Sequence, residues 1–391
     1  MVRTDVPARR ALQPGQQPGG FGPRDIHLAY HLPPTGAGRT VAITIPFHDP
    51  NLESDLAVYH RQFNLPTCTK ANGCLRVINQ RGGTDLPTAT DRTWALEESL
   101  DVDAVSAACQ HCRILVVEAD DNNLGNLFQA TLQGAAEGAK FVSNSWTVPE
   151  FPGETYGDTL LRNLPGVVFA FASGNAGGQT FYPSASPYVT SVGGTTLPRD
   201  SMGHLLPETA WAGSGSGCSA FEPKPSFQHD TFCPNSRTTA DVSAVADDAT
   251  GLAVYDTYPP PNNATGWLVL GGTSLSTALV AGMYALAGNP APGTFPNSYP
   301  YARPQNFNDI VTGCAGTFCA GPGYDPPTGI GTPHGVRGLR LGGHHNWDAP
   351  ARWPFTASGG GAASGLVPAT CAAMDIRCLG ALAARYFSHR S

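Results

Sequence analysis

The sequence predicts an α/β fold in which a mostly parallel sheet carries helices on both faces. Two observations lead to this class. Short runs of β-branched and aliphatic residues recur along the chain, and they are nearly continuous in apolar side chains rather than alternating. Strands that are buried on both faces have this composition. Segments with helical spacing separate the runs, as the connections between parallel strands require.

The elements follow one another in a regular order. A strand at residues 41–45 (VAITI) is followed by a helix at 51–63. The later elements are strands at 112–119, 140–146 and 166–175, with helices at 94–109, at 123–139 and from Ser274 into the apolar run that ends near residue 288. In such sheets the functional residues lie beyond the carboxyl ends of the strands. The segments SNSW, ASGN and GGTS stand at that end.

Composition divides the chain into three parts. Residues 1–20 are rich in Pro, Gln and Gly and are predicted to be disordered. Residues 21–340 are predicted to form the main domain. Residues 341–391 are predicted to be a Gly-rich linker, which contains SGGGAASG, and a C-terminal tail.

Charge and hydropathy exclude several classes of partner. Only 14% of residues are charged and the net charge is −7, which argues against nucleic acid and against an anionic membrane surface. No apolar run approaches the ~20 residues of a membrane span. The first residues lack the apolar core of a secretory signal, so we expect such a signal to have been removed or to be encoded upstream.

The ten cysteines fall into five close pairs. Two of the spacings are too wide for a zinc knuckle, so we expect local disulfides rather than metal sites. Disulfides in turn indicate an oxidising, extracellular compartment. The pairs are Cys68/Cys74, Cys109/Cys112, Cys218/Cys233, Cys314/Cys319 and Cys371/Cys378.

Ser274 follows two glycines and opens the apolar helix. Ser is a preferred helix N-cap, so its hydroxyl could serve only to cap the helix. A Ser at a helix N-terminus can also be a nucleophile, because the helix dipole favours negative charge that develops on its oxygen. A nucleophile needs a base, so the rest of the chain decides between the two interpretations.

The usual base would be a His, but the only His-Gly pair in the chain follows Ser274, and no G-x-S-x-G motif occurs. The helix at 94–109 supplies another candidate. Its Glu97 and Asp101 are four residues apart and share one helical face, whereas Asp103 points elsewhere. Because this helix is largely apolar, we expect at least one acid to face inward. A buried pair would share a proton and could act as base and acid; a solvated acidic face is the alternative.

Several motifs occur in one order: EESLD, SNSW, ASGNAG, YPSASPYVTSVGGTTL and GGTSLS. Together they resemble the sedolisin family of serine-carboxyl peptidases over roughly residues 22–335. The resemblance implies a subtilisin-like fold and peptide-bond cleavage by a Ser nucleophile, a Glu base and an Asp that hydrogen-bonds that Glu. These roles fall on Ser274, Glu97 and Asp101. The start of the match resembles the family's mature N-terminus, which implies a folding propeptide outside the present sequence.

Two positions depart from the family pattern. Asn175 stands where the family has an Asp that supplies the oxyanion hole, and Ala278 stands where the family has a Pro. An Asp donates a hydrogen bond only while it is protonated, whereas an Asn amide donates at any pH. We therefore expect Asn175 to donate to the oxyanion and to extend activity from acidic toward near-neutral pH. The alternative is that Asn175 only caps a turn in a decayed site.

A third group of residues indicates a cation site. Asp309 and Asp325 lie in a Gly-rich segment, a combination that suits calcium, although such a segment is also an ordinary turn. The segment resembles the family's calcium loop. The resemblance implies one structural Ca²⁺ held by the side chains of Asp309 and Asp325 and the carbonyls of Ile310, Gly321 and Gly323.

These features predict a secreted, monomeric serine-type endopeptidase that acts on peptide or protein substrates. Two alternatives stay open. One is a Ser-His subtilase whose His is not recognisable from the sequence. The other is a non-enzymatic extracellular protein that binds peptides on a decayed peptidase scaffold.

Overall fold

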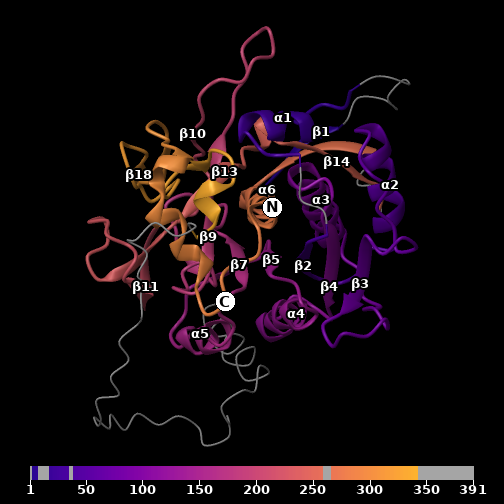
Figure 1. Cartoon of the computed structure of the whole chain (residues 1–391), viewed down its shortest axis with the longest axis horizontal. Helices are drawn as coiled ribbons and strands as arrows, with labels where there is room; N and C mark the ends of the chain where they lie inside the picture. Colours follow the sequence, from indigo (N-terminus) through magenta and orange to yellow (C-terminus); the bar gives the residue numbers. More distant parts are fainter. Residues whose placement is uncertain (1, 8–16, 35–37, 259–265, 342–391) are drawn as a thin grey trace, which may run out of the picture.

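The computed structural model describes residues 2–7, 17–34, 38–258 and 266–341 (Figure 1). The predicted linker and tail from residue 342 onward, with the Cys371/Cys378 pair, lie outside the described residues.

A mostly parallel sheet forms the central layer, as predicted. Its strands are β2 (Thr40–Pro46), β3 (Leu75–Asn79), β4 (Arg113–Ala119), β5 (Phe141–Asn144), β7 (Val168–Ala172), β9 (Thr190–Thr196), β10 (Thr209–Ala210) and β13 (Val242–Val245). The order across the sheet is β10-β9-β7-β5-β2-β4-β3, and β13 also pairs with β9. All pairs are parallel except β10 with β9.

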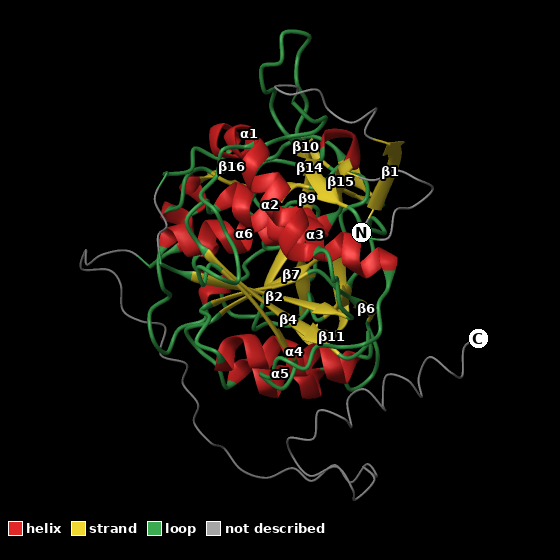
Figure 2. Ribbon diagram, turned by 90° about the vertical axis from the view of Figure 1, so that its right-hand side faces the viewer, coloured by secondary structure: helices red, strands yellow, loops and turns green. Residues whose placement is uncertain are grey.

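Helices cover both faces of this sheet. They are α1 (Pro23–Ala29), α2 (Leu52–Gln62), α3 (Arg92–Ala108), α4 (Leu124–Ala136), α5 (Thr155–Arg162) and α6 (Thr273–Ala287). Figure 2 shows α2, α3 and α6 on one side of the sheet and α4 and α5 on the other. Val41, Ile43 and Ile45 of β2 belong to the core that includes α3 and α6, whereas Ala42 belongs to the core on the α4 side. The strand is mostly apolar, as expected when both of its faces are buried.

Helices α3 and α6 lie against each other in the core. The side chain of Asp91 caps α3 by accepting hydrogen bonds from the backbone N–H groups of Thr93 and Trp94. Gly282 of α6 permits the close approach, since a Cβ at this position would lie 2.9 Å from the Cβ of Ala108. Both helices are buried along nearly their whole length, so polar side chains on their facing surfaces are removed from water.

A second, antiparallel sheet has the order β1-β15-β14. Its strands are β1 (Val2–Pro7), β14 (Leu252–Asp256) and β15 (Gly266–Gly271). Strand β1 lies within the segment that the composition predicted to be disordered, and its pairing with the edge of β15 departs from that expectation. The edge of β15 offers unpaired backbone groups that a polar, Pro-containing segment can satisfy, which composition alone does not reveal.

Short elements complete the described residues. Two-stranded pairs are formed by β6 (Val148–Pro149) with β8 (Phe181–Tyr182), β11 (Gly217–Pro223) with β12 (Ser236–Thr239), β16 (Phe307–Asn308) with β19 (Thr332–Pro333), and β17 (Cys314–Ala315) with β18 (Phe318–Cys319). Single 3₁₀ turns lie at Asp248–Thr250, Pro296–Ser298, Pro300–Ala302, Pro304–Asn306 and Arg337–Leu339.

Four of the five predicted disulfides are present in the described residues, which confirms the pairing by proximity. They are Cys68–Cys74, Cys109–Cys112, Cys218–Cys233 and Cys314–Cys319. The second of these ties the end of α3 to the start of β4.

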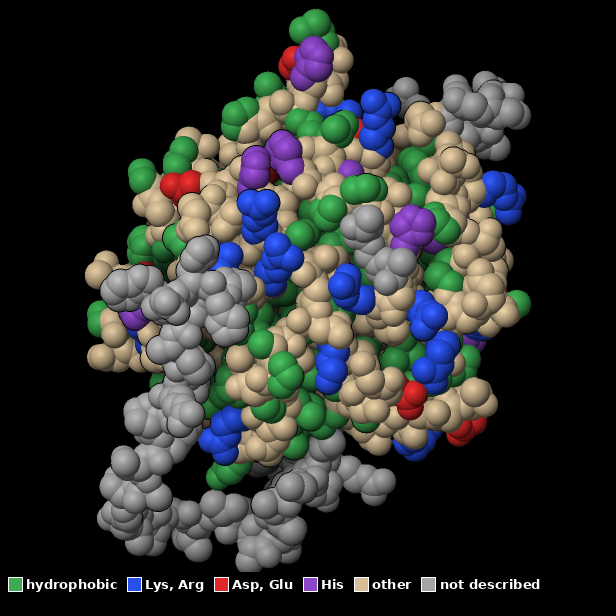
Figure 3. Space-filling model, in the orientation of Figure 1, with side chains coloured by type: hydrophobic (Ala, Val, Ile, Leu, Met, Phe, Trp, Pro, Cys, Tyr) green, Lys and Arg blue, Asp and Glu red, His purple; other side chains and the backbone are tan. Residues whose placement is uncertain are grey.

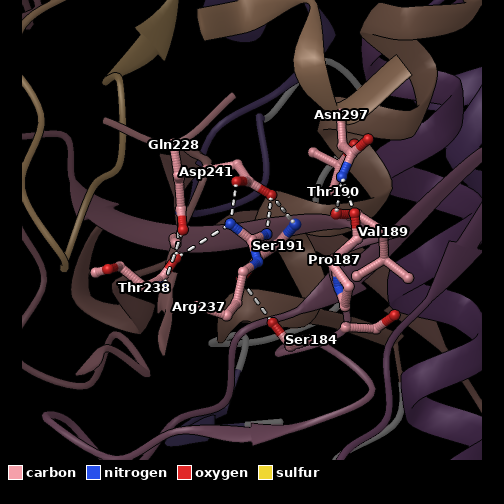
Figure 4. A network of polar contacts seen from close by, with 12 residues as sticks. Ser184, Pro187, Val189, Thr190, Ser191, Gln228, Arg237, Thr238, Asp241 and Asn297 are labelled. Carbon is pink, nitrogen blue, oxygen red and sulfur yellow. Dashed lines mark hydrogen bonds and ion pairs between the residues drawn. The ribbon is translucent and has the colours of Figure 1, made fainter. Parts of the chain in front are cut away.

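A buried ion pair joins β12 to Asp241, the residue that precedes β13 of the central sheet. The guanidinium of Arg237 donates two hydrogen bonds to the carboxylate of Asp241, at 2.7 and 2.5 Å, and neither side chain is exposed. The backbone N–H of Ser191 in β9 donates to the same carboxylate at 2.7 Å. Figure 4 shows Arg237 and Asp241 facing each other beside Ser191. Loss of one partner from such a site would leave the other charge buried and unpaired, so the pair fixes this part of the backbone.

Many of the Asp and Glu side chains of this chain lie in its interior rather than on the face that Figure 3 shows. Few Asp and Glu side chains appear on the face drawn in Figure 3, while many carboxylates of this chain are buried. Within the part of the chain that the structure describes, no helix has the length and apolar character needed to cross a bilayer.

Candidate active site

The structure brings three of the predicted site residues together between α3 and α6. Glu97 is 1% exposed, Asp101 0% and Ser274 2%. A hydrogen bond joins the hydroxyl of Ser274 to the carboxylate of Glu97. Asp103 points elsewhere, as its helical position predicted, and accepts a hydrogen bond from the backbone N–H of Tyr255 at 3.1 Å. The solvated acidic face that was the alternative for Glu97 and Asp101 is therefore excluded.

Burial controls the charge of the two acids. It raises the pKa of Glu97, and the hydrogen bond from Ser274 opposes this rise. Burial also raises the pKa of Asp101 well above its usual value, and the neighbouring charge of Glu97 raises it further. The hydroxyl of Ser145 donates to Asp101 Oδ1 at 2.8 Å and opposes the shift. Burial and the neighbouring charge of Glu97 thus favour the protonated form of Asp101 over its ionised form.

The helix cap at the start of α6 is Gly272 rather than Ser274. Gly272 has φ of 101°, a left-handed conformation that a residue with a Cβ adopts at a cost, and its N–H donates to the carbonyl of Ala246 at 2.6 Å. Ser274 is the second residue of the helix. Its hydroxyl is thus not the capping group, and the positive end of the helix dipole lies next to its oxygen.

Asn175 is held beside Ser274 by the preceding residue, Thr273. The backbone N–H and the hydroxyl of Thr273 both donate to Asn175 Oδ1, at 2.8 and 3.0 Å. A backbone N–H can only donate, so the accepting atom must be the amide oxygen, and this settles the orientation of the amide. Gly174, one residue earlier, donates its N–H to the Thr273 hydroxyl at 3.1 Å. Within the described residues Asn175 Nδ2 has no acceptor, and it lies at the start of α6.

The loop predicted to bind calcium also closes on itself. Gly323 donates its N–H to Asp309 Oδ2 at 2.9 Å, and Gly321 donates to Asp325 Oδ2 at 3.3 Å. Asp325 is 1% exposed; burial raises its pKa to about 6, and the charge of Asp309 contributes to the rise. Ile310 is buried beside Asp309.

The acids of this loop fit a hard cation in part. Two carboxylates converge on one Gly-rich segment, and the mutual repulsion of Asp309 and Asp325 is the kind of arrangement that a bound cation relieves. Among the described residues no group of three or more His, Cys, Asp or Glu side chains has metal-binding geometry. A site here would therefore depend on backbone carbonyls for its remaining ligands.

Two residues of the site were not predicted from the sequence. Ser145 donates to Asp101, and Thr273 orients Asn175. The position of Ser145 directly after a buried strand was the available signal, since side chains at that end of a parallel sheet meet. Trp146, the residue after Ser145, packs between Phe128 and Phe171 and belongs to the core.

Comparison with known proteins places the chain among the subtilases and their sedolisin-type relatives. The model of the subtilase family matches residues 92–303. Kumamolisin from Bacillus sp. (strain MN-32) is 29% identical over 83% of this chain and 64% of its own length. Tripeptidyl-peptidase 1 from Canis lupus familiaris is 30% identical over 72% of this chain and 56% of its own length. The chain thus spans less than two thirds of these relatives.

A solved structure gives the same result for the fold. The structure of Pseudomonas sedolisin, described as a serine-carboxyl proteinase complexed with two molecules of pseudo-iodotyrostatin, superimposes with a TM-score of 0.69. The match covers 81% of this chain and 95% of that chain, at 25% sequence identity.

Proposed function

The chain belongs to the subtilase family and to its sedolisin branch, and from this premise we propose that it is a secreted serine-carboxyl endopeptidase, active from acidic to near-neutral pH. One observation carries the proposal. The buried hydroxyl of Ser274 is hydrogen-bonded to the buried carboxylate of Glu97, with Asp101 one turn further along the same helix. A nucleophile and a base in direct contact, with a third group that orients the base, is the arrangement that covalent catalysis requires.

The proposed reaction follows from this contact. Glu97 accepts the proton of Ser274 as its oxygen attacks the carbonyl carbon of a peptide bond. The Asn175 amide donates to the oxygen that becomes negative, and the start of α6 adds its dipole. The proton on Glu97 then passes to the leaving amine, which leaves an acyl group on Ser274. Water attacks that ester with Glu97 again as base, and Asp101 shares the proton throughout.

Direct labelling of Ser274 tests this proposal. With an activated peptide ester at pH 4 and an acid quench, mass spectrometry is expected to find one acyl group on Ser274, because the ester resembles the proposed intermediate. Ser276→Ala is the matched control, since among the described residues this nearby hydroxyl donates to the Thr273 carbonyl and not to an acid of the site. Labelling that spares Ser274, or that persists in Ser274→Ala, would favour the peptide-binding alternative.

We also propose one structural Ca²⁺ in the loop that contains Asp309 and Asp325, with the carbonyls of Ile310, Gly321 and Gly323 as further ligands. The two convergent carboxylates support this proposal. The loop is anchored to the core, because Ile330 donates its N–H to the carbonyl of Asp241 at 2.8 Å. An ion would stiffen the loop between this anchor and the Cys314–Cys319 disulfide.

Removal of calcium is expected to lower the melting temperature. With Ca²⁺ at about 100 times its Kd the ion would contribute about 2.7 kcal/mol, which for a domain of this size corresponds to a fall of roughly 4 °C on chelation. Differential scanning calorimetry with and without EGTA measures the change. Asp309→Asn keeps an acceptor for the Gly323 N–H but removes a charge, so its transition should respond little to calcium. An identical transition for the native protein in EGTA and in calcium would rule the ion out.

The remaining assignments rest on composition and on the family. Four disulfides in the described residues support an oxidising, extracellular compartment. We propose peptides or proteins as substrates, a monomeric enzyme, and a propeptide partner as the family resemblance implies. The net charge of −7 gives no support to nucleic acid or to a membrane surface as a partner.

A further inference from the structure

Behind the Glu97–Asp101 pair lies a second group of buried ionisable residues that the proposed reaction does not use. Glu98 on α3 is 1% exposed, Glu118 in β4 is 0% exposed and Asp49, after β2, is 2% exposed. His48 precedes Asp49, and its side chain is 22% exposed. Buried carboxyls cost free energy, so a cluster of them next to an active site calls for a role.

The contact between His48 and Glu118 results from the register of two parallel strands. Ile45 of β2 lies opposite Glu118 of β4, and the N–H of Phe47 continues the pairing by donating to the carbonyl of Ala119 at 2.8 Å. Phe47 then adopts φ of 70°, a conformation that is costly for a large side chain. After this turn the imidazole Nδ1 of His48 lies 2.8 Å from Glu118 Oε1. The strained backbone at Phe47 thus places the imidazole of His48 against the buried carboxylate of Glu118.

Glu98 lies between this contact and the catalytic pair. Glu98 and Asp101 are three residues apart on α3 and are therefore neighbours on the helix surface. The backbone N–H of Asp49 donates to the Glu98 carboxyl. Burial raises the pKa of Glu98 well above its usual value, and the charges of Glu118, Asp49 and Asp101 each raise it further. Glu98 thus interacts with the strand ends on one side and with the catalytic pair on the other.

Among the described residues the charges that act on this cluster are mostly acidic, and they include Asp256 beside Asp49. Lys70 is the cation whose charge acts on both His48 and Glu118, and Asp49 also acts on His48. Asp55 acts on Asp49, whose pKa burial raises to about 6. The hydrogen bond to Glu118 raises the pKa of His48 against the effect of partial burial. His48 is therefore the partly exposed basic side chain that is hydrogen-bonded to this acidic cluster.

We propose that His48, Glu118 and Glu98 are positioning residues that couple the charge of a partly exposed imidazole to the protonation of the Glu97–Asp101 pair. The inference rests on the proposed function for its kinetic consequence. Protonated His48 keeps Glu118 ionised, and Glu98 holds a proton between Glu118 and Asp101. Loss of the imidazolium removes the positive charge from a poorly solvated region, so every carboxyl of the cluster ionises less readily.

The kinetic test is the acidic limb of kcat/KM against pH, where Glu97 must be ionised in the free enzyme. In His48→Gln this limb is expected to move to higher pH by about 0.5 to 1 unit. His48→Lys retains a positive charge and should restore the limb. In Glu98→Gln the side chain can no longer exchange a proton. Adding His48→Gln to this variant should therefore shift the acidic limb by less than half of the shift that His48→Gln causes in the native enzyme. His204→Gln, at an exposed turn where His204 contacts Asp200, is the matched control and should leave the limb in place.

A second measurement does not need activity. Coupling is reciprocal, so neutralising the catalytic pair in Glu97→Gln/Asp101→Asn is expected to lower the pKa of His48, measured by NMR, by about as much as the kinetic limb moves. Two results together would overturn the inference even if the native protein is an active peptidase. The acidic limb of kcat/KM would stay at the same pH in His48→Gln, and the pKa of His48 would be unchanged in Glu97→Gln/Asp101→Asn. An inactive native protein whose His48 pKa does respond would instead count against the proposed function alone.

Discussion

Ser274→Ala and Glu97→Gln are each expected to lower kcat/KM by about 10⁴-fold or more, and the double variant should be no less active than either single one. The reason is that the hydroxyl and the carboxylate act as one unit. The two side chains are hydrogen-bonded, and both are almost fully buried, so no water replaces the proton acceptor once Glu97 is gone. Cleavage of a denatured protein between pH 3 and 8 measures the loss.

Asp103→Asn is the matched control for Glu97→Gln. Asp103 is on the same helix and equally buried, but its carboxylate faces Tyr255, whose N–H an Asn oxygen can still receive. This variant should keep most of its activity if it folds. Equal losses in Asp103→Asn and Glu97→Gln would mean that the effect is structural.

Glu97→Gln also separates the proposed mechanism from a Ser-His subtilase. A His-based enzyme would keep most of its activity without Glu97. Among the described residues no His bonds to Ser274. His60 contacts the Pro66 carbonyl and the Ser106 hydroxyl, and His48 contacts Glu118. Retained activity in Glu97→Gln would therefore require a rearrangement around Ser274 or a base outside the described residues.

The sequence was sufficient where a local pattern decides the structure. Apolar runs predicted β2, β4, β5 and β7, and the four-residue spacing of Glu97 and Asp101 on an apolar helix predicted an inward-facing pair. The close cysteine pairs predicted the disulfides of the described residues, since short loops bring the sulfurs together whatever the tertiary fold.

The remaining features depend on segments that are distant in the chain. The orientation of the Asn175 amide is decided by Thr273, which lies 98 residues further on. The contact of His48 with Glu118 spans 70 residues and depends on strand register and on the backbone of Phe47. No local pattern encodes such pairs, because the sheet aligns the strand ends only after the chain has folded.

The second large effect concerns Asn175. Asn175→Asp is expected to keep activity near pH 4 and to lose about 10²- to 10³-fold in kcat at neutral pH. The alkaline limb of the pH profile of kcat should therefore move to lower pH. An Asp side chain can still accept the two hydrogen bonds from Thr273, so the loop should hold its position. What changes is the group that faces the substrate. A carboxyl donates to the oxyanion while it is protonated, but once ionised it cannot donate and repels the developing charge.

Asn175→Ala distinguishes this effect from damage to the loop. It removes the donor at every pH, and it also removes the acceptor for Thr273, so its loss in kcat should be about the same at pH 4 and pH 7. If kcat depends on pH in the same way in Asn175→Asp and in the native enzyme, the Asn175 amide does not donate a hydrogen bond to the oxyanion. The contrast between the two variants is informative because Oδ1 is already committed to Thr273. Among the described residues no partner engages the amide Nδ2, so we expect this atom to act on the substrate. In the Asp variant a carboxyl oxygen takes its place, and whether that oxygen can donate depends on pH.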